Sequence, residues 1–173
     1  MAEARTQETP PRTVTQIPVP AEVRALSTLD RIDYADAFRV DVGAVLGRTG
    51  EQWARAMLAD APLRVRAKLV CGWSVLGLRL GPPWSPRRVL GWQVRRGGPD
   101  SARLGSVLLG ARSWAGMPGE LLFRPEPRGV LFATFLQLDN TAARARWARV
   151  APTHQRVVRS LLTHAARRAV SGG

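Results

Sequence analysis

The chain has 173 residues and carries 26 Lys and Arg against 13 Asp and Glu, a formal net charge of +13. This length predicts one domain with its own hydrophobic core, and the single cysteine, Cys71, excludes an internal disulfide. The best candidate for a membrane span, 69–80, is too short, and residues 1–20 lack the apolar segment of a signal peptide, so we expect a cytoplasmic protein.

The positive charge is spread along the chain, with no block of five or six basic residues. All but one of the 26 basic residues are arginine, the exception being Lys68, which is typical of codon usage in a GC-rich bacterium. We therefore expect diffuse surface charge and no specific nucleic-acid site. A basic surface that binds nucleic acid or anionic lipid stays open as an alternative.

Residues 1–22 are rich in proline and polar residues, which indicates a disordered tail before a single domain over 23–170. The segment 33–42 then alternates in character, with Tyr34, Phe38 and Val40 on one side, and this pattern predicts a half-buried strand. Asp36 falls on the apolar side of that strand.

Two helices are expected after this strand. Thr49-Gly50-Glu51-Gln52 has the form of a capping box, which starts a helix that runs to about Ala59. Pro62 is suited to the first turn of a second helix, which runs to about Leu78 before Gly81-Pro82-Pro83. Cys71 lies in an apolar part of this second helix, and we expect it to be buried rather than reactive.

From Val89 the period changes to two, and four short apolar segments separated by turns predict an antiparallel meander. These segments are 89–95, 104–109, 120–124 and 130–138.

The last element, 140–170, is predicted as a long amphipathic helix, in which Pro152 either introduces a kink or begins the second half. Its apolar stripe consists of Trp147, Val150, Ala151, His154, Val157, Val158, Leu161, Leu162 and Ala165. The fold class is therefore α+β, with a curved antiparallel sheet wrapped around a long C-terminal helix and two short helices after the first strand.

Three segments carry a resemblance to a known group of proteins. Ile32-Asp33-Tyr34-Ala35-Asp36-Ala37-Phe38, Val89-Leu90-Gly91-Trp92 and the stretch 147–158 with its Pro152-Thr153-His154 step resemble a bacterial family known as a domain of unknown function. That family is similar to the START-like, polyketide-cyclase-type (SRPBCC) helix-grip superfamily, and the resemblance covers roughly residues 25 to 168.

The resemblance implies a helix-grip fold with an apolar cavity between the sheet and the terminal helix. In the superfamily this cavity holds lipids, sterols, polyketides or hormones, and a minority of members catalyse cyclisation or dehydration. No catalytic motif is common to the superfamily, so no active-site residue is transferred to this chain.

His154 lies in the middle of the apolar stripe, where such a cavity would be. It could act as a general acid or base, orient a polar group of a ligand, or simply be a buried histidine with an internal hydrogen bond. Asp36 could pair with His154, or it could cap a turn ahead of the regular strand. If the protein is an enzyme, these two residues are the catalytic candidates for a cyclase or dehydratase, a lyase or isomerase.

The aromatic residues could form the walls of a pocket for a hydrophobic small molecule, or they could be plain core. The candidate ligand-binding residues are Trp73, Trp92, Trp147, Phe123, Phe132 and Leu161, with Trp114 as a further aromatic residue. We expect no metal site, because His154 and His164 face different directions on the helix. We expect no cofactor either, because no phosphate loop is present. The identity of the ligand and the oligomeric state stay open.

Overall fold

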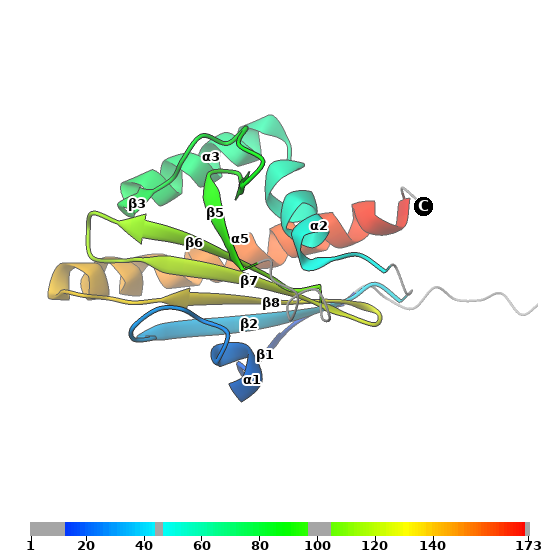
Figure 1. The fold of residues 1–173 in the computed structure, drawn as a ribbon, viewed down its shortest axis with the longest axis horizontal. Coiled ribbons are helices and arrows are strands. Elements are labelled where there is room, and N and C mark those ends of the chain that lie inside the picture. The colour runs from blue at the N-terminus through cyan, green and yellow to red at the C-terminus, as the bar shows by residue number, and fades with distance from the viewer. Residues whose placement is uncertain (1–12, 44–46, 97–104, 172–173) are drawn as a thin grey trace, which may run out of the picture.

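The computed structural model describes residues 13–43, 47–96 and 105–171, and it has the expected α+β architecture (Figure 1). All strand pairs are antiparallel, in the order β1-β2-β8-β7-β6-β5-β4, with β3 paired to β6. The strands are β1 (Thr13–Ile17), β2 (Tyr34–Asp41), β3 (Leu78–Arg79), β4 (Arg88–Val89), β5 (Trp92–Arg96), β6 (Val107–Ser113), β7 (Gly119–Glu126) and β8 (Gly129–Leu136). The helical elements are α1 (Ala21–Arg24), α2 (Gly50–Ala54), the π-helical turn η1 (Arg55–Ala59), α3 (Leu63–Val75) and α5 (Thr141–Ser171).

One face of the sheet, which we call the inner face, packs against α5, α2 and η1. Phe38, Phe132 and Phe123 are register partners across β2, β8 and β7, and the rings of Phe123 and Phe132 lie 5.0 Å apart edge to face. The predicted stripe of α5 lies over this row, with Leu162 buried in the same cluster. The predicted helix-grip arrangement of sheet and terminal helix is confirmed, and α5 continues as one helix through Pro152.

The opposite, outer face of the sheet is covered by the segment 17–35. Six apolar side chains of this segment pack on Leu108, Leu122, Leu131 and Phe135: Ile17, Val19, Val23, Leu26, Leu29 and Ile32. Residues 13–22 are therefore ordered structure, in contrast to the expected disordered tail, because β1 extends the sheet beside β2. Residues 1–12 of that expected tail lie outside the described part of the chain.

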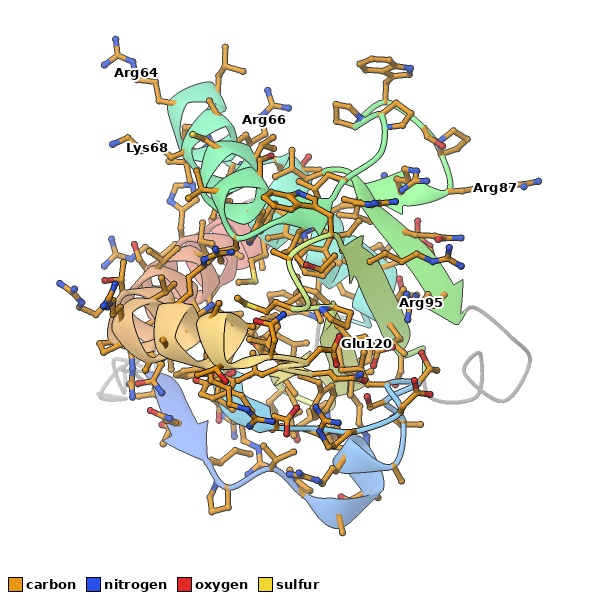
Figure 2. The ribbon with its side chains drawn as sticks, turned by 90° about the vertical axis from the view of Figure 1, so that its left-hand side faces the viewer. Arg64, Arg66, Lys68, Arg87, Arg95 and Glu120 are labelled. Atoms are coloured by element: carbon orange, nitrogen blue, oxygen red, sulfur yellow. The ribbon has the colours of Figure 1, made fainter. Side chains whose placement is uncertain are left out.

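A buried carboxylate fastens this covering segment to the sheet. Glu120 on β7 is fully buried, and it accepts hydrogen bonds from the Oγ of Ser27 at 2.6 Å, the backbone N–H of Thr28 at 3.0 Å and the Oγ1 of Thr28. Arg95 on β5 donates to it from Nη1 at 3.0 Å, and Figure 2 shows the two side chains together at the sheet. The charge is thus held by several donors, as a buried carboxylate requires.

One local prediction differs from the structure and another is confirmed. The expected strand 89–95 is a hairpin, in which Leu90 (φ 46°) and Gly91 (φ 90°) make the turn between β4 and β5. Leucine rarely adopts a positive φ, so no turn was expected at Leu90. The predicted capping box is present, because Thr49 and Gln52 exchange backbone and side-chain hydrogen bonds at the start of α2.

The helix α3 has no buried residue along its length. Leu63 and Val75 are 72% and 69% exposed, and Cys71 is exposed, so the expectation that Cys71 is buried is wrong. The reason is geometric, because α3 packs on the core only through the partly buried Val65, Leu69, Val70 and Trp73, and Cys71 lies outside this set.

Candidate ligand-binding site

An apolar cavity of about 340 Å³ lies between α3, α5 and the inner face of the sheet. Its deep side is made of buried residues on the strands and the loop before β7, and its outer side of exposed residues on the two helices. The lining residues are Lys68, Leu69, Gly72, Trp73, Val75, Leu76, Leu78, Trp92, Met117, Leu121, Thr134, Leu136, Trp147, Val150, Thr153, His154 and Val157.

Four of the residues proposed from the sequence line this cavity, namely Trp73, Trp92, Trp147 and His154. The rings of Trp73 on α3 and Trp92 on β5 lie 5.4 Å apart at 87°, so the helix touches the sheet through this edge-to-face pair. Trp147 packs its ring 5.1 Å from that of His154. The site therefore combines side chains from both helices and from the sheet.

Three other proposed residues, Phe123, Phe132 and Leu161, do not line the cavity and belong to the closed core. Trp114 is 64% exposed. On β8 the inward residues run from Thr134 at the cavity to Phe132 in the core. The cavity therefore ends at Thr134, two residues along β8 from Phe132.

His154 and Asp36 are in contact, as the hypothesis of an acid–base pair required. The Nε2 of His154 lies 3.3 Å from the Oδ2 of Asp36 and 3.2 Å from the Oγ1 of Thr134. Asp36 is 4% exposed and lies within β2, and no capped turn is present there. Thr134 was missed from the sequence, although a single polar residue on the inward side of an apolar strand was a signal for it.

The carboxylate of Asp36 is also held by Tyr34, the only tyrosine of the chain. The hydroxyl of Tyr34 donates to Oδ2 at 2.7 Å, and the amide of Gln155 donates to the Tyr34 oxygen at 3.2 Å. Burial raises the pKa of Tyr34 well above its ordinary value, and the hydrogen bond to Asp36 adds to this shift. Tyr34 is therefore a neutral hydrogen-bond donor at physiological pH.

These contacts set the tautomer of His154. A carboxylate only accepts hydrogen bonds, so the ring nitrogen that faces Asp36, Nε2, carries the proton. The other nitrogen, Nδ1, is then an acceptor, and no described residue bonds to it. The imidazole is thus oriented by a buried carboxylate while keeping one nitrogen free to receive a proton.

The wall also contains two polar groups that have no partner within the described residues. The indole nitrogens of Trp92 and Trp147 are buried and make no hydrogen bond, and the two residues are 2% and 5% exposed. An indole N–H can only donate.

The outer rim of the cavity carries one charged lining residue, Lys68. The exposed lining residues are Lys68, Gly72 and Val75 on α3 and Thr153 and Val157 on α5. Over residues 63–75 and 141–171 the sequence has three and seven basic residues respectively and no Asp or Glu. Figure 2 shows Lys68 and Arg64 extending from the same side of α3.

Within the described residues, no three His, Cys, Asp or Glu side chains gather closely enough to hold a metal ion. In the same part of the chain, no helix has both the length and the apolar character needed to cross a membrane. Comparison with protein-family models, with curated proteins and with solved structures finds no match to this chain.

Proposed function

We propose that this protein binds a hydrophobic small molecule in the cavity between α3, α5 and the sheet. One observation carries the proposal, the apolar cavity of about 340 Å³ with Trp73, Trp92 and Trp147 in its wall. Small-molecule sites have volumes of about 300–1,000 Å³ and predominantly apolar walls with a few polar groups. The resemblance to the START-like superfamily, whose members hold apolar ligands between sheet and helix, supports the same proposal.

Gly72 offers a test that leaves the backbone undisturbed. It lines the cavity, and a Cβ placed on it would meet no atom within 4 Å. Gly72→Phe should fill the entrance and weaken binding of the neutral fluorophore N-phenyl-1-naphthylamine at least about tenfold, a loss of about 1.4 kcal/mol. Gly72→Ala also replaces a glycine inside the helix, but it adds only a methyl group. This variant should bind as the wild type does.

The measurement is a fluorescence titration of the wild type and both variants, with circular dichroism to show that all three are folded. Equal binding by Gly72→Phe and Gly72→Ala would show that the fluorophore lies elsewhere. Absence of binding to the wild type would remove the proposal. Native mass spectrometry of the purified protein would in addition reveal a retained ligand by its mass.

A second candidate function is an enzyme of the cyclase or dehydratase type in the same cavity. The observation that favours it is the contact between Asp36 and His154, which leaves Nδ1 of the imidazole free. In a dehydration, Nδ1 would take a proton from a carbon next to a carbonyl, and the imidazolium so formed would return this proton to the hydroxyl on the next carbon, which would leave as water. A water-poor cavity would protect such a reaction.

The variants His154→Gln and Asp36→Asn distinguish catalysis from binding. We expect both to retain the neutral fluorophore while losing at least about 100-fold in turnover of an alkyl β-hydroxy ketone, because general base catalysis contributes about that much. The product enone is followed by its ultraviolet absorbance. If the wild type has no turnover, the catalytic candidate is rejected. Loss of folding in both variants would assign the pair a structural role.

A further inference from the structure

We infer that the occupant of the cavity is a single-chain anionic amphiphile, with its apolar chain between the tryptophans and its acidic group at the rim beside Lys68. This inference rests on the proposed function and names the class of ligand. It is carried by two features of the described residues: the ammonium of Lys68 at the rim and the size of the space.

The charged group of the cavity lining is a hydrogen-bond donor. Lys68 has three donors and no acceptor, and it lies on the exposed outer side of the cavity. A ligand whose polar atoms are acceptor oxygens complements this group, whereas an amine or ammonium ligand does not.

The charge of the rim has one sign. The sequences of α3 and α5 contain no carboxylate, and Lys68 lies in the cavity wall itself. Asp36 lies behind His154 and does not line the cavity itself; its Oδ2 accepts from Tyr34 and lies beside the imidazole, and its buried Oδ1 has no partner among the described residues. An anionic group at the rim therefore meets an excess of positive charge, and a cationic group meets repulsion.

Lys68 also differs in kind from the other basic residues. It is the only lysine of the chain, and an ammonium on a flexible stem is a point charge that can follow a ligand head group, whereas guanidinium is planar. The volume of about 340 Å³ lies at the low end of the range for small-molecule sites, which favours one alkyl or aromatic chain over a two-chain lipid.

The test compares three ligands with the same ten-carbon chain: decanoate, 1-decanol and decyltrimethylammonium. Each is titrated against the protein loaded with N-phenyl-1-naphthylamine, at low ionic strength and below the micellar concentration. We expect decanoate to displace the fluorophore best and the ammonium worst. Lys68→Gln should weaken decanoate about fivefold and leave 1-decanol unchanged, a size typical of one exposed charge pair.

Arg87→Gln is the matched control, because it removes one positive charge from the other side of the molecule, as Figure 2 shows. Arg87 is exposed, and its side chain makes no hydrogen bond or ion pair within the described residues, while its backbone carbonyl accepts from the N–H of Val94. It should bind decanoate as the wild type does, and Lys68→Arg should recover most of the affinity. Equal losses in Lys68→Gln and Arg87→Gln would assign the preference to net charge and overturn the inference.

A second measurement locates the head group. Because the chain has one lysine, acetylation of Lys68 by acetic anhydride can be followed by peptide mass spectrometry against the N-terminal amine. Decanoate should slow this acetylation more than 1-decanol does. Equal displacement by all three ligands, or equal protection, overturns the inference and leaves the binding proposal standing. Failure of the fluorophore itself to bind removes both.

Discussion

Two side chains from different strands hold the same nitrogen of His154, and this shared contact fixes the orientation of the ring. Asp36 on β2 and Thr134 on β8 are register partners, so the sheet itself places them next to each other beneath α5. Alternation along residues 33–42 was sufficient to predict that Asp36 points inward. The contact with His154 needed the register between β2 and β8, which no local pattern contains.

Asp33, the residue immediately before β2, links the start of this strand to the segment that leads into α5. Its carboxylate accepts from the Nε of Arg31 at 2.8 Å and from the backbone N–H of Leu138 at 2.7 Å, and Arg144 lies 3.6 Å away. The hydrogen bond from Arg31 is the largest cause that lowers the pKa of Asp33 to about 2, followed by the bond from Leu138. The folded state therefore prefers the ionised carboxylate.

This shift predicts a pH dependence of stability with a definite sign. The pKa of Asp33 is below its ordinary value of about 3.9, so its contribution is complete above about pH 4 and is lost as the pH falls towards about 2. In urea titrations, the difference between the wild type and Asp33→Asn should be largest at neutral pH and shrink over that acidic range. A difference that stays constant with pH would contradict the assigned pKa.

At the scale of elements, the segment 17–35 and the helix α3 behave in opposite ways. The segment carries few regular hydrogen bonds but is fastened by Glu120, whereas α3 is a regular helix with no buried residue. Sequence periodicity predicted the helix and overlooked the segment, because periodicity reports regular structure and not the strength of attachment. The exposure of Cys71 follows from the position of α3 at the cavity rim.

The contribution of Glu120 to holding the segment 17–35 on the sheet can be tested by removing one negative charge at a time from β7. Glu120→Gln should lower the free energy of unfolding by about 3 kcal/mol, since it removes the negative charge of a fully buried carboxylate that accepts from Ser27, Thr28 and the partly exposed guanidinium of Arg95. The matched control is Glu126→Gln on the same strand, whose partner Arg39 is half exposed, and it should cost less than about 1 kcal/mol. The free energies of unfolding of both variants are compared by urea unfolding. Equal losses would show that Glu120 stabilises the fold no more than the exposed pair of Glu126 and Arg39 does.

At the scale of the whole molecule, the fold class followed from the order of predicted elements, while the limits of the cavity did not. The segment 130–138 was predicted as a strand, which puts Phe132 and Thr134 on one face but does not distinguish the residue in the core from the residue at the cavity. That distinction depends on where α3 and α5 diverge, which is a property of the packed helices. The same holds for Phe123 and Leu161, which were expected at the cavity and lie in the core.

The order of synthesis, from the N-terminus to the C-terminus, affects the segment 17–35 that covers the outer face of the sheet. Ser27 is synthesised early, but its partner Glu120 follows 93 residues later, and Leu131 and Phe135 of the surface it covers come after that. The nascent chain must therefore carry Val23, Leu26 and Leu29 unburied until most of the protein has been made. Exposure of these apolar side chains during synthesis, rather than low stability of the finished protein, is the cost of covering a sheet with a segment that precedes most of its strands.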